Sequence, residues 1–451
     1  MNVVRPVSVA VTLLSLLLAV AASALGASVP RTPLHATTAE QEEPVNLVVV
    51  GYQLPPDLLE PQLQQFQSLY PNVTVEFLRL GDSEAYIPGL QMLINAGTPI
   101  DVLLVNGDSF TAALASDLLL DVTDTVSYYD RFNEKLFYDE FFKVEGRRYG
   151  VPTGIGYFST LMYNQQLLSE LGLTFPQTFD ELTAAAPTFR EAGVAPVAGF
   201  GKEWNFYAVM TLHMVLDQMA GNNQVQVLRD TLSGEMAFTD QVYQDAWTCA
   251  LRYFEEELFQ VEPGPNGAAW LGLDEATAGA ILPANKVGMA WNGNWSFPSL
   301  KEAAQESGGT FELGLGLPPL CPDVPSGAVS RAVAYPGNLW SVYKEATHPD
   351  EAMAFLDFMS SDESAQAWMN YYETNLTSNV NATPPQGDAI DEAGRALFDD
   401  GVIDATWMLG IDLSQYYAEQ FQRVVKGEQS ISDGLAAVET WKLENADKLS
   451  S

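Results

Sequence analysis

Hydrophobic and polar positions along the first part of the chain alternate in a pattern typical of an α/β sheet. Apolar, mostly β-branched residues fill 46–50 and indicate a buried strand of a parallel sheet. A helix with one apolar face is expected to begin at Pro61 and to stop at Pro71. Strands are expected over 73–78 and 101–105. Because strands and helices follow each other in succession, we expect right-handed crossovers between parallel strands.

Similar signals continue through the rest of the chain. We expect a helix over 161–171, closed by Gly172, and a buried strand over 287–291. Other helices carry capping signals, in which polar side chains satisfy the free backbone amides of the first turn. These signals lie at 178–181 and 347–350, and a last helix is expected to begin at 430–433.

The N-terminus has the pattern of an export signal. Arg5 precedes an apolar run over 7–20, and small residues follow this run. The run is too short to span a bilayer comfortably. Ser28 stands where a lipoprotein has its lipid-bearing cysteine, so we expect no lipid anchor. We predict a signal peptide over 1–27, a flexible leader over 28–44, and a mature protein that is exported and soluble.

Composition and charge limit the classes of function. The chain has 451 residues, of which 47% are hydrophobic, so it can form two or three domains or one fold with two lobes. Its 21 basic residues stand against 58 acidic residues, which gives a net charge of −37. Such a charge repels phosphate backbones and anionic lipids, and it argues against nucleic-acid binding and electrostatic membrane docking. It is compatible with simple solubility outside the cytoplasm, and also with cationic or neutral ligands.

Residues that support metal binding or catalysis are sparse. Two cysteines and three histidines leave little for a transition-metal site, so we expect no metal and no cofactor. Cys249 and Cys321 form either one disulfide or two buried free thiols, and the sequence leaves both open. His213 lies among apolar residues of an expected buried helix, and the common hydrolase motifs are missing. We expect no enzyme, and a secreted glycoside hydrolase remains a weaker alternative.

One stretch of sequence resembles a known family. Residues 147–182 read RRYGVPTGIGYFSTLMYNQQLLSELGLTFPQTFDEL, and the motifs Tyr-Gly-Val-Pro, Tyr-Asn, Gly-Leu and Pro-x-Thr-x-Asp-Glu-Leu stand in this order. They resemble the extracellular solute-binding proteins of ABC importers, especially the maltose- and trehalose-binding type that takes sugars and oligosaccharides. Further similar segments are 66–77, 94–108, 287–295 and 348–366.

The resemblance implies an α/β, two-lobed periplasmic-binding-protein fold with a central ligand cleft and three interlobe crossings. Several crossings allow the two lobes to close on a ligand as a hinge. The implied lobes are 45–150 plus 321–375 and 151–320 plus 380–451, with crossings near 150–156, 317–320 and 374–381.

A neutral sugar presents hydroxyls around its ring and C–H patches above it. A site for it needs aromatic faces for stacking, together with carboxylates or amides for hydrogen bonds. Trp295 follows the strand 287–291, where the resembling family places a stacking Trp. Asn292 and Asn294 either contact the sugar or only shape the loop around Gly293.

Other candidates follow the first and third strands. Asp108 lies after 101–105, at the edge where open α/β sheets bind ligands, although it would also suit a helix cap. Tyr52 and Gln53 follow the first strand at the same edge, and Asp82 lies in the loop after the second strand.

The remaining candidates rest on their position in the resembling family, and packing is the alternative role of each. Tyr157 lies just past the first crossing, and Trp204 with Asn205 follows an apolar segment. Trp407 lies where a late aromatic closes over the sugar. The segment from Tyr335 to Asn338 takes the place of a glycine-rich cleft loop, and Pro336 and Asn338 depart from that pattern.

We therefore predict a non-enzymatic, monomeric receptor that binds a carbohydrate, preferably an oligosaccharide, and delivers it to a membrane ABC permease. The alternative ligands on the same fold are a polyamine, held by acids and aromatics, and ferric iron, held by tyrosinates. An acid cluster facing the cleft would favour the polyamine. The adjacent tyrosines that suggest iron are Tyr128 and Tyr129, Tyr371 and Tyr372, and Tyr416 and Tyr417.

Overall fold

The computed structural model describes the chain from residue 43 to residue 446, with gaps. No helix within these described parts combines the length and the apolar character that a membrane span requires. The predicted signal peptide, nearly all of the leader, Gln53 and Asp82 lie outside the described residues. The described residues are 43–52, 54, 56–80, 83–124, 131, 143–144, 146–152, 156–158, 160–335, 338–372, 379–383, 389–399, 402–403 and 406–446.

The first sheet contains the three strands that the apolar pattern predicts near the N-terminus. β1 pairs in parallel with β2 and β3, and these pairings confirm the expected parallel sheet. β13, from much later in the chain, pairs antiparallel with β3 and with the short β6. The sheet order is β2 (Val73–Arg79), β1 (Val45–Gly51), β3 (Val102–Val105), β13 (Leu339–Val342) and β6 (Val151–Pro152).

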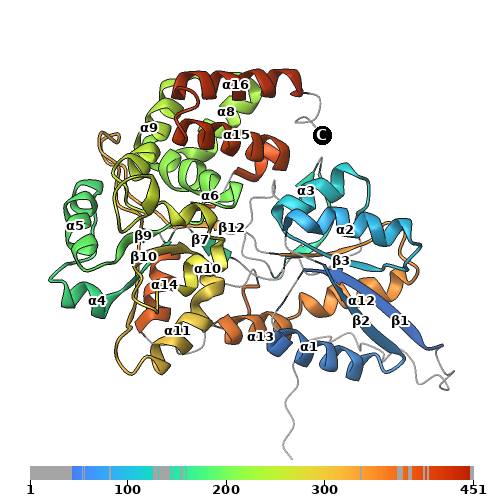
Figure 1. Ribbon diagram of the computed structural model, residues 1–451. Coiled ribbons are helices and arrows are strands. Elements are labelled where there is room, and N and C mark those ends of the chain that lie inside the picture. The colour runs from blue at the N-terminus through green and yellow to red at the C-terminus, as the bar shows by residue number, and fades with distance from the viewer. Residues whose placement is uncertain are drawn as a thin grey trace, which may run out of the picture. The chain divides into compact units, whose positions relative to one another are not determined.

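Helices cover both faces of this sheet because alternate strand residues point to opposite sides. Leu47 and Val49 pack into one apolar cluster, and Val48 and Val50 pack into another. In Figure 1, α1 and α12 lie beside β1 and β2, whereas α2 and α3 lie on the other side, next to β3. The first cluster contains residues of α1 (Pro56–Leu69), α12 (Pro349–Met359) and α13 (Asp362–Tyr372), and the second contains residues of α2 (Ser83–Asn95) and α3 (Gly107–Ala115).

The second sheet corrects one predicted helix. Its order is β11 (Leu313–Gly316), β8 (Thr160–Asn164), β10 (Val287–Asn292) and β9 (Ala195–Ala198). The helix expected over 161–171 is wrong in its first half, because β8 lies between β10 and β11 and pairs antiparallel with both. Helix α4 covers only Gln165–Glu170.

A large aromatic core packs around this second sheet. The ring of Phe206 lies 4.7 Å from that of Phe200, 5.2 Å from that of Tyr207 and 5.3 Å from that of Phe259, centroid to centroid. Figure 1 shows α8, α9, α15 and α16 gathered beside one another. The helices here are α5 (Phe179–Glu191), α6 (Trp204–Ala208), the π-helix η2 (Val209–Val215), α7 (Leu216–Met219), α8 (Gln224–Ser233), α9 (Gln241–Glu255), α10 (Glu275–Ala280), α11 (Phe297–Glu306), α14 (Ala389–Asp399), α15 (Gly410–Val425) and α16 (Ile431–Glu444).

A third, small sheet joins three distant parts of the chain. β12 (Val333–Tyr335) pairs antiparallel with β7 (Gly156–Phe158) and parallel with β14 (Val402–Ile403). Along the chain, β7 lies between β6 of the first sheet and β8 of the second, and β12 lies between β11 of the second sheet and β13 of the first. The other short elements are β4 (Lys143–Val144), β5 (Arg147–Arg148) and the 3-10 helices η3 (Pro265–Gly267), η4 (Ala269–Gly272), η5 (Asn294–Ser296) and η6 (Thr406–Leu409).

Three predicted helix starts can be compared with the structure. Thr178 caps α5 in a capping box, as predicted, and α16 begins where the last helix was expected, with the Ser430 side chain as its cap. The box expected at 347–350 is wrong, because His348 is the N-cap of α12 and makes no side-chain cap hydrogen bond. The backbone amide of His348 instead donates to the buried carboxylate of Asp101 at 2.8 Å.

Helix α1 begins at Pro56, so the start predicted at Pro61 is also wrong. Pro61 lies inside the helix on its exposed side. Water there can satisfy the carbonyl oxygen that the missing proline amide leaves free.

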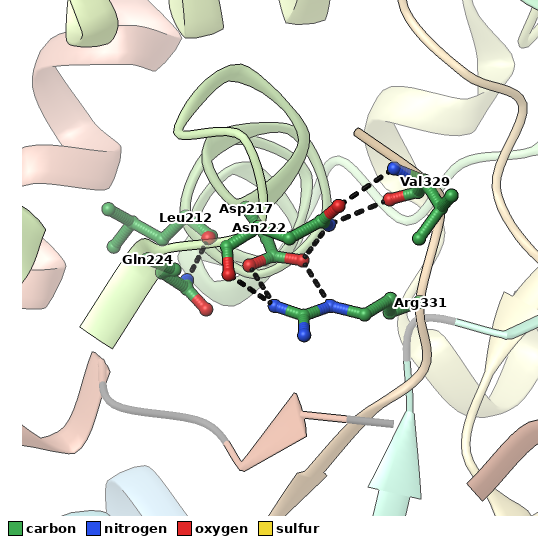
Figure 2. A network of polar contacts seen from close by, with 6 residues as sticks. All are labelled: Leu212, Asp217, Asn222, Gln224, Val329 and Arg331. Atoms are coloured by element: carbon green, nitrogen blue, oxygen red, sulfur yellow. Dashed lines mark hydrogen bonds and ion pairs between the residues drawn. The ribbon is translucent and has the colours of Figure 1, made fainter. Parts of the chain in front are cut away.

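The long segment between β11 and β12 is fastened to the second sheet's helices. Cys249 of α9 and Cys321 form a disulfide, with Cα atoms 6.2 Å apart, which decides between the two states left open above. Figure 2 shows a second fastening, in which Arg331 donates to both carboxylate oxygens of Asp217 at 2.7 and 3.0 Å. Because these contacts hold the segment up to Arg331, we propose that the second crossing lies between Arg331 and β12.

The corner between α7 and α8 gives this fastening its shape. Asn222 has a φ of 66°, a left-handed conformation that Asn tolerates better than most residues. Its side chain donates to the carbonyl of Val329 at 2.8 Å and accepts from the amide of Val329 at 2.8 Å. It also donates to Asp217 at 2.9 Å, so one side chain links the loop and the ion pair (Figure 2).

Candidate ligand-binding site

Predicted site residues meet at one edge of the second sheet. The parallel strands β9 and β10 both end there, and the antiparallel β8 begins there. After β9 the chain enters α6 with Trp204 and Asn205, and after β10 it forms the short η5 turn with Trp295. The hydroxyl of Thr160 donates to the carbonyl of Asn292 at 2.9 Å and ties β8 to this turn.

The turn after β10 presents Trp295 to solvent. Trp295 is 39% exposed, whereas Asn292 and Asn294 are buried. The side-chain oxygen of Asn292 accepts from the amide of Gly293 at 2.8 Å, and Ser296 donates to the carbonyl of Gly293 at 2.8 Å. Asn292 therefore has the loop-shaping role that was one of its two expected roles.

Gly293 is required because the indole ring lies directly on it. A Cβ atom at this position would come within 2.0 to 2.3 Å of three carbons of the Trp295 ring. Real Cβ atoms do not approach so closely, so any larger residue would displace the ring.

Two carboxylates that no sequence motif singled out lie beside this aromatic residue. Glu275, the first residue of α10, has its carboxyl close enough to the side chain of Trp295 for this neighbour to oppose part of the rise in the carboxyl's pKa. The backbone amide of Glu275 donates to the carboxylate of Glu203 at 3.4 Å. Burial raises the pKa of Glu275 to about 7, and the charge of Glu203 adds to the increase. The two acids and the indole thus form one connected group.

The only sequence signal for these acids was their position at helix starts. Glu203 is the N-cap of α6, but its side chain makes no capping hydrogen bond. Asp274 does cap α10, since its carboxylate accepts from the amide of Thr277 at 2.9 Å. Hydrogen bonding by the side chain and by the backbone amide of Thr277 holds the pKa of Asp274 below its usual range.

Trp204 and Asn205 lie at the start of α6. Trp204 is half-buried and packs against the core of the second sheet. The side-chain oxygen of Asn205 is buried and has no hydrogen-bond partner among the described residues. The helix continues into the π-helix η2, a rare geometry that is frequent at functional sites.

The carboxyl edge of the first sheet holds a second group of candidates. Tyr52 follows β1, and its hydroxyl donates to the side chain of Asn338, just before β13. Its ring also packs edge to face on Tyr86, with centroids 5.8 Å apart. Asn106, after β3, is the N-cap of α3, so the helix-cap role considered for Asp108 is wrong. Asp108 is the second residue of α3, and its side chain is not among those the structure describes.

The third sheet carries two more candidates on its backbone. Tyr157 of β7 pairs with Ala334, and Tyr335 of β12 pairs with Gly156. β7 packs against η5, so the strand of Tyr157 neighbours the turn of Trp295. The orientations of these two tyrosine side chains are outside the description.

Trp407 lies in η6, directly before α15. Its side chain is also outside the description. α15 packs against α3, and the position of a Cβ at Gly410 would be 4.0 Å from the side chain of Thr111. The turn of Trp407 therefore lies near the helix that contains Asp108.

The groups that suggested iron do not form such a site where the structure describes them. Tyr417 is fully buried and accepts a hydrogen bond from the indole of Trp247 at 2.5 Å, and Tyr416 stacks on Trp441. Tyr371 packs against the core of the first sheet, whereas Tyr128 and Tyr129 lie outside the described residues. Within the described ranges, no group of three or more His, Cys, Asp or Glu could hold a metal ion.

Comparison with known proteins gives one similar sequence and many similar folds. A multiple sugar-binding protein from Streptococcus mutans is 23% identical over 244 residues, which is 53% of this chain and 53% of that protein. The chain thus matches about half the length of this relative. A chitin oligosaccharide binding protein superposes with a TM-score of 0.73 at 16% identity, over 89% of this chain and 100% of the other.

The GacH receptor of Streptomyces glaucescens superposes with a TM-score of 0.69 at 17% identity, over 89% of this chain and 98% of the receptor. These likenesses confirm the predicted α/β fold with two lobes. The model of the bacterial extracellular solute-binding protein family matches residues 53–366, from the end of β1 into α13. This match covers more than half of the chain. The chain, with its two large sheets and the helices that cover them, therefore belongs to the bacterial extracellular solute-binding proteins.

Proposed function

We propose that the protein is an exported receptor that binds a carbohydrate, preferably an oligosaccharide, and delivers it to an ABC permease. The observation that carries this proposal is the exposed indole of Trp295 beside two carboxylates at the edge of the second sheet. Aromatic faces and carboxylates are the two kinds of group that a sugar ring requires. The similar proteins named above are themselves sugar- or oligosaccharide-binding proteins by name.

The chemistry assigns a different role to each group. The face of Trp295 would stack on the C–H patches of a sugar ring, and Glu203 would accept hydrogen bonds from its hydroxyls. The unpartnered oxygen of Asn205 would accept another. Tyr52 and Asp108 would contribute from the edge of the first sheet, so a bound ligand would favour closure of the lobes.

The pair of carboxylates also favours a second candidate. Glu203 and Glu275 beside Trp295 are the combination of acids and an aromatic ring that a polyamine would use. However, the raised pKa of Glu275 reduces the negative charge that a polycation would need. A sugar therefore suits this group better.

Other parts of the proposal concern the chain as a whole. We propose that 1–27 directs export, that 28–44 is a leader, and that the monomer interacts with permease subunits on other chains. The energy for transport would come from ATPase subunits on other chains. The lobes are proposed to comprise 45–150 plus 332–375 and 151–331 plus 380–451, because the second crossing is placed after Arg331.

Trp295→Ala tests the proposal. The mature protein is titrated calorimetrically with chitin oligosaccharides, maltooligosaccharides, raffinose and stachyose, and it is expected to bind one of them. The variant is expected to bind this sugar about tenfold or more weakly, because stacking on the indole is lost. Trp441→Phe is the matched control, since Trp441 stacks on Tyr416 away from this edge. Binding of spermidine alone would replace the sugar by a polyamine, and binding of no sugar would contradict the proposal.

A further inference from the structure

The segment 268–273, which includes η4, is apolar although it lies at the surface. It reads Ala-Ala-Trp-Leu-Gly-Leu and has no polar side chain, in a chain that otherwise carries 79 charged residues, 58 acidic and 21 basic. Ala269 and Leu271 are exposed, and of these six residues only Trp270 is buried. An exposed apolar run is unfavourable unless it serves a function. A binding role would explain why this segment is apolar.

Backbone hydrogen bonds hold the segment at the edge of the second sheet where the candidate site lies. Gly201 follows the end of β9, and its amide donates to the carbonyl of Trp270 at 3.1 Å. The amide of Lys202 donates to the carbonyl of Leu273 at 3.2 Å. A Cβ atom at Gly201 would lie 2.4 Å from the Trp270 ring and 3.2 Å from the Cα atom of Leu271. The buried ring of Trp270 therefore anchors the segment, and Leu271 lies beside the chain that enters α6.

The same segment continues into α10, which adjoins the turn of Trp295. The amide of Glu275 donates to the carboxylate of Glu203 at 3.4 Å, so the two chains remain side by side up to the start of α10. A Cβ atom at Gly279 would lie 2.8 Å from the side-chain nitrogen of Asn292, the last residue of β10. α10 thus connects the apolar segment with the turn that presents the indole.

Leu271 and Trp295 are both large apolar side chains exposed at this edge. Leu271 is 43% exposed and Trp295 is 39% exposed. Within the described ranges, the other exposed large apolar side chains belong to other segments, namely Leu69, Met92, Val329, Val380 and Leu443. Because Leu271 and Trp295 belong to segments joined through α10 and not to one turn, we expect them to contact different parts of a ligand.

We propose that Leu271 is a specificity-determining residue of the carbohydrate site: its side chain contacts a ring of the oligosaccharide other than the ring that stacks on Trp295, so the protein prefers longer chains. This inference rests on the proposed function of Trp295. An aliphatic side chain makes no hydrogen bonds, but it can cover the C–H patches of a sugar ring. It therefore selects a ligand by its length and not by the configuration of its hydroxyls.

The test varies the length of the sugar. Members of the oligosaccharide series that gives heat on titration are compared for the full mature protein and for Leu271→Ser. The variant is expected to bind the longest member about threefold or more weakly, because apolar contact area is lost. It is expected to bind the shortest member with unchanged affinity. Leu271→Met, which keeps an apolar side chain, should retain the preference for length.

Leu443→Ser is the matched control, since Leu443 is also an exposed leucine and lies in α16. This variant is expected to bind every member as the unmodified protein does. Denaturant unfolding of each variant separates loss of a contact from loss of folding. If Leu271→Ser does not fold, Leu271→Trp replaces it, and its larger apolar surface is expected to strengthen binding of the longest member alone.

Two results would overturn the inference. One is a change in affinity that is equal for all members of the series, and the other is an unchanged affinity for all of them. In both cases, weakened binding in Trp295→Ala would leave the proposed function intact. Failure of every sugar to bind the folded, unmodified protein would overturn both the inference and the proposed function.

Discussion

The indole of Trp295 lies against a residue that has no side chain. Gly293 has an ordinary negative φ, so its backbone conformation alone does not require glycine. The requirement comes from the ring, which occupies the space where a Cβ atom would be. Because Gly293 has no side chain, the indole of Trp295 can lie on its backbone, and this contact determines which part of the ring is exposed to solvent.

Replacement of Gly293 by alanine tests this contact. The extra methyl group is expected to displace the indole, to lower the free energy of unfolding by about 1–3 kcal/mol, and to weaken sugar binding. Gly272→Ala is the matched control, since a Cβ there would meet nothing within 4 Å. Denaturant unfolding and titration calorimetry measure the two effects. Equal behaviour of the two variants would show that the ring moves away at no cost.

At the scale of elements, the corner between α7 and α8 holds the segment that leads to β12. The Asp217 side chain is 3% exposed, whereas that of Arg331 is 21% exposed. Loss of the arginine would leave a buried carboxylate without its partner, but loss of the carboxylate charge would leave a guanidinium that can reach water. The two halves of one ion pair are therefore not equivalent.

Arg331→Leu is consequently expected to destabilise the protein more than Asp217→Asn. We expect a loss of about 3–5 kcal/mol in the free energy of unfolding for the first and about 1–2 kcal/mol for the second. Arg423→Leu is the control, because Arg423 and Glu428 form an exposed pair, for which about 1 kcal/mol or less is expected. Chemical denaturation of the three variants gives the order, and a larger loss for Asp217→Asn would contradict the burial argument.

For the whole molecule, the disulfide joins α9 to a segment far along the chain. Cys249 and Cys321 are separated by 72 residues, and both pack in the core around the second sheet. A covalent link of this span restricts the unfolded chain much more than it alters the folded one. The link therefore adds stability without taking part in the site.

Replacement of both cysteines by alanine is expected to lower the free energy of unfolding by about 4 kcal/mol, as the loop-closure entropy of such a span predicts. Sugar affinity under native conditions should change little, because the cysteines lie in the core, away from Trp295. Unfolding of the double variant and of the unmodified protein, each with and without reductant, measures the effect. A reductant effect on the double variant would show that another cause is responsible.

The sequence correctly predicted those strands and helices that are specified by their own residues. The apolar runs of β1, β3 and β10, the cap of α5 and the start of α16 need only local chemistry, and they were predicted correctly. The segment 161–171 was not, because Leu161 and Met162 suit the interior of a helix as well as that of a sheet. Pairing with β10 and β11, which lie more than a hundred residues away, decides for the strand.

For the site, the sequence alone determined that aromatic and amide side chains follow the ends of strands. It also determined the acidic charge of the chain and the motifs of its family. Only the tertiary structure decided that Glu203 and Glu275, 72 residues apart, meet beside Trp295, and that Cys249 is linked to Cys321. The physical reason is that a carboxylate acquires a raised pKa, and a thiol a partner, from neighbours that the folded chain brings close, whereas a sequence specifies only the neighbours along it.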